Sequence, residues 1–153
     1  MSLTYVQGNL FKEPFSTVLV NPVNCEGVMG AGLAREFKRH YPEMFQRYQV
    51  VCRRRLLIPG KVLPLTLADG KRIICFPTKN SWRKPSRLEW IEAGLGRLVA
   101  WLQEAMPDAI AIPPLGCGLG GLDWPDVHDL MERAFADAPK GTEIRIYAPK
   151  EGP

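Results

Sequence analysis

Two glycine-bearing segments, each following an apolar strand directly, constrain the fold more than any other feature of this chain. The first spans residues 18–33 and the second residues 110–122. Glycines at the end of a strand allow a sharp backbone turn and let bare N–H groups approach an anion. Neither segment has the spacing of the G-x-G-x-x-G fingerprint or of a P-loop. Two such loops predict a ligand with two phosphates. The missing fingerprints argue against an ordinary dinucleotide-binding fold and against a P-loop NTPase.

Strand-like and helix-like segments alternate along the 153 residues. Apolar, β-branched runs predict strands at 3–7, 17–21, 61–67, 72–77, 109–113 and 143–148. Helical periodicity predicts helices at 30–40, 42–54, 88–106 and 124–137. Ser86 to Glu89 resembles a capping box, and Asp123 stands where a helix N-cap is expected. The alternation predicts an α/β sandwich over a largely parallel sheet, in which ligands bind at the carboxyl ends of the strands.

Composition favours one globular domain in a reducing setting. The chain is 46% hydrophobic and 24% charged, and its length suits a single domain over residues 1–153. Its four cysteines form no C-x-x-C pair, and we expect Cys75 and Cys117 to be buried. We interpret His40 and His128 as structural, and we therefore expect no metal. No apolar run approaches the roughly 18 residues of a membrane span. These features predict a cytoplasmic monomer that does not enter a membrane.

The net charge of +4 is unevenly distributed. Residues 71–87 contain six basic residues and no acidic one, and residues 35–61 contain eight basic residues against Glu36 and Glu43. Residues 101–153 contain nine acidic and four basic residues. One side of the molecule is therefore expected to be basic, which suits an anionic polymer. The alternative is an ordinary solvated surface charge.

Three motifs in order along the chain resemble those of a macrodomain, the ADP-ribose-binding α/β/α fold. They are Gly8-Asn9-Leu10-Phe11, the loop from Asn21 to Leu33, and the loop from Gly116 to Leu122. Residues 23–30 and 76–83 are similar to the branch typified by the terminal ADP-ribose protein glycohydrolase and the DarG antitoxins. The resemblance implies a three-layer sandwich with a mixed, largely parallel sheet. It further implies a hydrolase, without a cofactor, that removes ADP-ribose from thymidine in single-stranded DNA. Such an enzyme removes the modification that a cognate DarT-type toxin attaches to DNA. The chain is then expected to be a single macrodomain, or one excised from a longer antitoxin.

The resemblance also implies the site residues. Lys79 is the expected nucleophile on the anomeric carbon of the distal ribose, and its amine must be neutral to attack. Burial and neighbouring cations such as Arg83 favour the neutral amine. Trp82, Arg83 and Lys84 are the expected DNA contacts, by base stacking and by phosphate binding. The residues expected to bind ADP-ribose are Gly8, Asn9, Leu10, Asn21, Asn24, Gly30, Ala31, Gly32, Leu33, Thr78, Pro114, Leu115, Gly116, Cys117, Gly118, Leu119, Gly120 and Gly121.

Alternatives remain open for several of these residues. Lys79 could be a solvated lysine at a strand end, and Trp82 a hydrophobic plug. Asn21 and Asn24 could serve only as turn residues. Asp123 could assist Lys79 or simply cap a helix. The runner-up functions are a non-catalytic ADP-ribose-binding module and a hydrolase of ADP-ribosyl esters on protein carboxylates.

Overall fold

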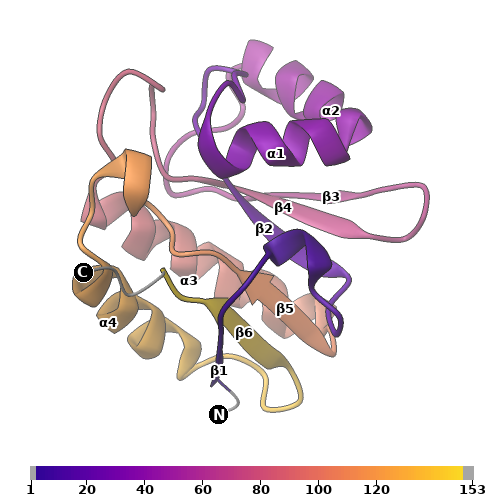
Figure 1. Ribbon diagram of the computed structural model, residues 1–153, viewed down its shortest axis with the longest axis vertical. Helices are drawn as coiled ribbons and strands as arrows, with labels where there is room; N and C mark the ends of the chain where they lie inside the picture. Colours follow the sequence, from indigo (N-terminus) through magenta and orange to yellow (C-terminus); the bar gives the residue numbers. More distant parts are fainter. Residues whose placement is uncertain (1–2, 150–153) are drawn as a thin grey trace.

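The computed structural model describes residues 3–149, which form six strands, four α-helices and two short 3₁₀ turns (Figure 1). In chain order these are β1 (Leu3–Val6), η1 (Leu10–Lys12), β2 (Val18–Val23), α1 (Gly32–His40), α2 (Pro42–Arg53), β3 (Leu63–Thr66), β4 (Arg72–Pro77), α3 (Leu88–Ala105), β5 (Ala109–Ile112), η2 (Gly118–Gly120), α4 (Trp124–Phe135) and β6 (Glu143–Tyr147). No helix within residues 3–149 combines the length and the apolarity needed to cross a membrane. Every predicted strand and helix is present, with bounds that differ by at most two residues at either end.

The strands form one mixed sheet in the order β1-β6-β5-β2-β4-β3. All neighbours run parallel except β3, which is antiparallel to β4. β2 pairs with β4 along its whole length but with β5 only at Leu19 and Ala111. Since that ladder stops early, the chain segments that follow β2 and β5 are free to separate. A crevice at the carboxyl ends of these two strands is where an open α/β sheet binds its ligand.

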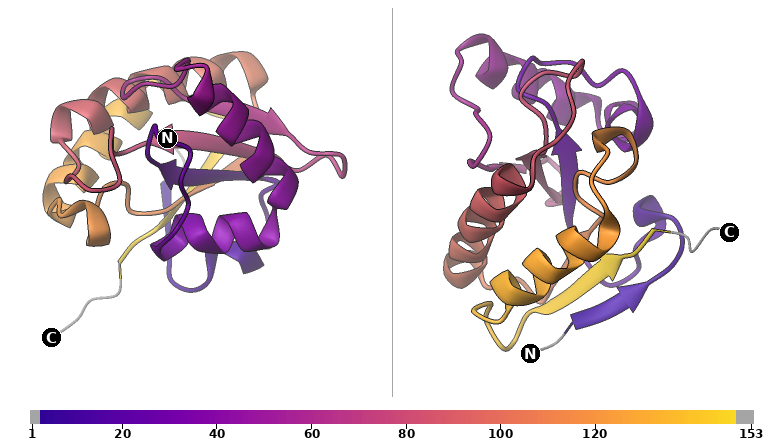
Figure 2. Two further views of the ribbon diagram at one scale, coloured as in Figure 1. Left: turned by 90° about the horizontal axis from the view of Figure 1, so that it is seen from above. Right: turned by 90° about the vertical axis from the view of Figure 1, so that its left-hand side faces the viewer.

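Helices cover both faces of the sheet, as Figure 2 shows, with α1 and α2 on one face and α3 and α4 on the other. The side chains of β2 alternate between the two hydrophobic cores. Val18 and Val20 pack in the core of α3 and α4, whereas Leu19 and Val23 pack in the core of α1 and α2. This alternation follows from the two-residue period of a strand buried on both faces. The predicted three-layer α/β/α sandwich is confirmed.

Three local predictions need correction. α3 begins at Leu88 with Arg87 in the N-cap position and no side-chain cap, so the capping box expected at Ser86 does not form. The reason is that the Ser86 N–H donates to the carbonyl oxygen of Gly120 at 2.9 Å, which draws Ser86 toward a neighbouring loop. Asp123 does occupy the N-cap position of α4, but its carboxylate makes no capping hydrogen bond. Cys75 is fully buried as expected, whereas Cys117 is partly exposed because it lines a pocket.

Candidate active site

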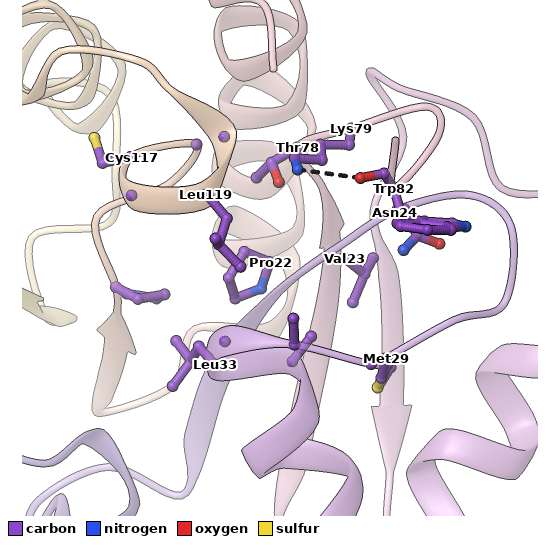
Figure 3. A pocket seen from close by; sticks show the side chains of 18 of the residues that line it. Pro22, Val23, Asn24, Met29, Leu33, Thr78, Lys79, Trp82, Cys117 and Leu119 are labelled. Atoms are coloured by element: carbon purple, nitrogen blue, oxygen red, sulfur yellow. Dashed lines mark hydrogen bonds between the residues drawn. The ribbon is translucent and has the colours of Figure 1, made fainter. Parts of the chain in front are cut away.

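A cavity of about 620 Å³ opens at the carboxyl end of the sheet, between the loops that follow β2, β4 and β5. Figure 3 shows side chains from all three loops around it, including Asn24, Lys79 and Leu119. A cavity of this volume is in the range of small-molecule and cofactor sites. The crevice expected from the sheet topology is therefore present, and three different strands supply its walls.

The loop after β2 is shaped by Asn24. Its Nδ2 donates to the carbonyl oxygen of Val28 at 2.8 Å, and its Oδ1 accepts from the Glu26 N–H at 2.9 Å and from the Tyr48 hydroxyl at 2.9 Å. This amide folds residues 24–28 into a compact loop and leads the chain to the start of α1. Ala31 occupies the N-cap position of α1 without a side-chain hydrogen bond. The first N–H groups of α1 therefore remain available to an anion in the cavity.

The loop after β5 forms the facing wall. Gly118 has φ +71°, a conformation that residues with a side chain rarely adopt, and it opens the short turn η2. Leu119 on this turn is 68% exposed and projects between the loops toward Pro22, as Figure 3 shows. Its Cδ1 atom lies so close to Gly32 that a Cβ there would be only 3.0 Å away. The two glycine loops thus meet across the mouth of the cavity at Leu119 and Gly32.

The segment from Thr78 to Arg87, here called the lysine loop, carries Lys79, the nucleophile predicted from the sequence. Thr78 and Lys79 leave β4 with their backbone N–H groups donating to the carbonyl oxygen of Val23, at 2.9 and 3.4 Å. The Lys79 side chain turns toward Trp82, and its Nζ donates to the Trp82 carbonyl oxygen at 3.4 Å (Figure 3). Trp82 is half exposed at the mouth, with the Arg83 guanidinium 5.0 Å from its ring centroid. A half-exposed ring favours the stacking interpretation over a hydrophobic plug packed on the sheet edge.

The lysine loop is fastened to both glycine loops. Its Asn80 carbonyl oxygen accepts from the Cys25 N–H at 3.2 Å. The Trp82 N–H donates to Glu26 Oε1 at 2.9 Å. A hydrogen bond from the Ser81 side chain, together with this one, lowers the pKa of Glu26 below its usual range. At its other end, the Ser86 N–H donates to Gly120, and a Cβ added at Gly120 would overlap the buried Ser86 hydroxyl. These contacts set where Lys79 stands relative to the cavity.

The cysteine thiols of the two glycine loops are poor nucleophiles. Burial, together with the nearby Asp123 carboxylate, raises the pKa of Cys117 to about 11. Burial, together with the charges of Cys52 and Glu26, raises the pKa of Cys25 to about 12. Both thiols are therefore protonated at neutral pH and lack the reactive thiolate. Residues 3–149 contain no cluster of His, Cys, Asp and Glu that could hold a metal ion. Lys79 contributes a side-chain amine to the cavity lining.

A second cavity of about 360 Å³ lies beside the first and shares Leu33, Pro113 and Pro114 with it. Gly8, Asn9 and Leu10 line this second cavity, as expected for one end of a nucleotide. Asn9 Oδ1 accepts from the Phe11 N–H at 2.9 Å and caps η1. The Phe11 ring in turn stacks on His40, with centroids 4.4 Å apart. His40, interpreted from the sequence as structural, therefore also lines a cavity.

The structure brings most of the predicted site residues together. Fourteen of them line the larger cavity: Asn24, Gly30, Ala31, Gly32, Leu33, Thr78, Lys79, Trp82, Pro114, Gly116, Cys117, Gly118, Leu119 and Gly120. Five others lie outside both cavities: Leu115 is fully buried, Gly121 is exposed at the end of η2, Arg83 and Lys84 are exposed in the lysine loop, and Asn21 is buried.

Asn21 lies beneath the cavity and not in its lining. It is fully buried on the α1–α2 side of β2, with its Nδ2 3.8 Å from the sulfur atoms of Met29 and Met44. The lining also includes Val28, Met29, Ala34 and Pro113, which the sequence analysis did not select. The first three flank the predicted Gly30–Leu33 run, so their position beside these glycines is the signal that could have identified them.

Comparisons with known proteins agree with this geometry. Residues 20–131 match the family described as Macro domain. A DNA ADP-ribosyl glycohydrolase of Mycobacterium tuberculosis is 45% identical over 153 residues, which cover 98% of this chain and 43% of that protein. The solved macrodomain of Mycobacterium tuberculosis DarG is 45% identical, with a TM-score of 0.91 over 97% of this chain and 98% of that one. Thermosipho africanus DarTG in complex with ADP-ribose is 32% identical, with a TM-score of 0.90 over 99% of this chain and 43% of that one. The chain spans less than half the length of the DNA ADP-ribosyl glycohydrolases it matches.

Proposed function

Because this chain belongs to the macro domain family, we propose that it is a DNA ADP-ribosyl glycohydrolase. Its substrate is ADP-ribosylated thymidine in single-stranded DNA, and the reaction removes the ADP-ribose group that a DarT-type toxin attaches. The observation that carries the proposal is Lys79, which stands in the lining of a cavity bounded by two glycine loops. The similarity to DNA ADP-ribosyl glycohydrolases over 98% of this chain supports the same activity.

ADP-ribose occupies both cavities in this proposal. The adenine end lies in the smaller cavity near Asn9, whose amide can accept a hydrogen bond from an exocyclic amine. The diphosphate lies between the first turn of α1 and the Gly118–Gly120 turn, where backbone N–H groups are available. The distal ribose then lies toward the lysine loop. The ADP-ribose complex of Thermosipho africanus DarTG supports a ligand of this type.

Lys79 acts as the nucleophile on the anomeric carbon of the distal ribose. Its neutral amine forms a bond to that carbon while the electron pair of the carbon–nitrogen bond leaves with the thymine base, which takes up a proton. Opening of the sugar ring gives a Schiff base between the lysine and the ribose aldehyde. Water then releases ADP-ribose and restores the amine. Asp123, which follows the second glycine loop at the N-cap position of α4, is the acidic residue proposed to assist.

The DNA strand contacts the rim of the larger cavity. Trp82 offers an exposed ring on which an unpaired base can stack, and Arg83 and Lys84 offer cations to the neighbouring phosphates. Arg83 and Lys84 form no ion pair within residues 3–149, so their charge is available.

All four cysteines are free thiols, which supports a reducing, cytoplasmic setting.

The decisive experiment compares two substrates. The protein is incubated with an oligonucleotide carrying ADP-ribosylated thymidine and with a protein carrying ADP-ribose on glutamate, and release of ADP-ribose is measured for each. Release from the oligonucleotide alone is expected. Release from the glutamate ester alone would favour the ester hydrolase, and binding of ADP-ribose without any release would favour a non-catalytic module.

A further inference from the structure

The end of α2 carries an uninterrupted basic run, Arg53-Arg54-Arg55, in which all three residues are exposed. None of the three forms an ion pair with any acidic residue in the described range 3–149. The acidic residue nearest to them in the sequence on α2 is Glu43, at the other end of the helix. The helix therefore ends in a compact, unneutralised positive charge, here called the arginine end of α2.

Arg55 has a backbone conformation in which glycine is the usual residue. Its φ is +55°, in the left-handed region. The Leu56 N–H donates to the carbonyl oxygen of Val51 at 3.2 Å, which makes Arg55 the residue after the C-cap in a Schellman motif. Glycine is preferred at this position because a Cβ is strained there. Strain of this kind persists only where the surrounding structure holds the residue in place, and it clusters at functional sites.

The arginine end of α2 lies beside the mouth of the larger cavity. Gln49 Nε2 donates to the Gly27 carbonyl oxygen at 3.2 Å, and a Cβ at Gly27 would touch Cys52 at 3.6 Å. The neighbouring Glu26 in turn holds the N–H of Trp82. Figure 1 shows the end of α2, the loop after β2 and the lysine loop along the upper edge of the molecule. The last turn of α2, which leads into the arginine end, thus packs against the loop that holds Trp82 through Glu26.

Within a DNA strand, nucleotides continue on both sides of a modified base. A strand that presents such a base to the cavity must therefore continue past the mouth in two directions. Arg83 and Lys84 supply exposed positive charge from the lysine loop next to Glu26, and the arginine end of α2 supplies it from the helix that packs on Gly27. We propose, resting on the function proposed above, that Arg53, Arg54 and Arg55 bind phosphates of the single-stranded DNA substrate on this second side of the mouth.

The test uses Arg55→Gly, which removes the charge and relieves the strained backbone at once. Kinetics are measured on an ADP-ribosylated thymidine within a long oligonucleotide and on the ADP-ribosylated thymidine nucleoside, over a series of salt concentrations. We expect KM for the oligonucleotide to rise roughly five-fold, as for one or two lost phosphate contacts, and the logarithmic salt slope to fall by about 0.7 per contact. KM for the nucleoside should stay unchanged, and the melting temperature should not fall.

Two variants provide matched controls. Met106 is the other described non-glycine residue with a positive φ, at +45°, and it caps α3. Met106→Gly relieves the same kind of strain without removing a charge. Lys140→Ala removes an exposed charge just before β6, at the end of the sheet away from the mouth. Both should leave KM for the oligonucleotide at the wild-type value.

The outcomes separate the two proposals. If the wild-type protein releases no ADP-ribose from the oligonucleotide, the proposed function is wrong. If the wild-type protein is active and Arg55→Gly keeps its KM and salt slope, the arginine end of α2 does not bind the strand. Equal changes for the oligonucleotide and the nucleoside would likewise overturn the inference, because they would indicate a disturbance of the cavity itself.

Discussion

The Nζ atom of Lys79 lies 3.4 Å from the carbonyl oxygen of Trp82, so the proposed nucleophile and the proposed base-stacking residue share one hydrogen bond. This bond closes a short turn within the lysine loop and directs the amine along the rim of the cavity. Any change that moves the Trp82 peptide therefore also moves the amine.

Replacement of Lys79 tests the mechanism. Lys79→Ala should abolish release of ADP-ribose while leaving the affinity for free ADP-ribose within about three-fold, since backbone groups of the glycine loops supply most of the binding. Lys79→Arg should be equally inactive, because a guanidinium remains protonated and cannot attack carbon. Borohydride should trap a covalent adduct on the wild-type protein only. Full turnover by Lys79→Ala would instead favour water activated by Asp123 or by a phosphate of the ligand.

Glu26 is expected to position the lysine loop without touching the substrate. In Glu26→Ala the Trp82 N–H loses its acceptor, and we expect kcat to fall roughly ten-fold through misplacement of the amine, with ADP-ribose affinity unchanged. Glu26→Gln keeps an oxygen at the same place and should restore kcat. If Glu26→Gln is as slow as Glu26→Ala, the charge matters and the hydrogen bond does not.

Two glycines of α3 should respond in opposite ways to the same substitution. Gly94 is buried against Phe76, and a Cβ added there would overlap the ring, so Gly94→Ala should lower the free energy of unfolding by about 2 kcal/mol. Gly96 is exposed with open space around it, and Gly96→Ala should raise the free energy of unfolding by about 1 kcal/mol through helix propensity. Denaturant titrations measure both. Equal effects would show that Phe76 can move aside.

Acid stability should depend on Glu13. Burial alone would raise the pKa of this carboxyl, but hydrogen bonds from Arg145, Tyr147 and two backbone N–H groups outweigh burial and lower the pKa below 4.5. A carboxyl whose pKa is lowered by folding stabilises the fold above its unfolded-state pKa. That stabilisation is lost as the pH falls below about 4.3 and through the folded-state pKa.

The matching variants are Glu13→Gln and Asp129→Asn. Glu13→Gln should cost about 2 kcal/mol at pH 7 and flatten the pH dependence between pH 5 and 3, because the charge-assisted bond to Arg145 at 2.7 Å is lost. The ion pair of Asp129 with Arg133 is well exposed, so Asp129→Asn should change stability by less than about 0.5 kcal/mol. An unchanged acid transition in Glu13→Gln would place the responsible carboxyl elsewhere.

The sequence was sufficient to predict the sheet and the loops at its carboxyl end. Strands such as residues 72–77 are apolar runs after their first residue. The glycines after β2 and β5 mark the points where these strands end and the loops begin. Asn21 shows the limit of this reasoning. It follows an apolar run just as Asn24 does, but β2 extends through Val23, so Asn21 is still within the strand and its side chain faces the buried α1–α2 layer.

Contacts between distant segments could not be predicted. The bond from Trp82 to Glu26 joins residues 56 positions apart, and the Phe11–His40 stack depends on how η1 meets the end of α1. Ser86 illustrates the same point, because its capping pattern is local whereas the hydrogen bond it makes is to a loop more than thirty residues away in the chain. Local propensity is a weak influence where a tertiary contact competes with it.

The wall formed by Leu33, Pro113 and Pro114 separates two cavities that open on the same end of the sheet. A ligand that fills both must extend past these three residues. In the proposed function this arrangement favours a molecule with two end groups joined by a bridge, because a molecule that fills one cavity alone leaves the contacts of the other unused.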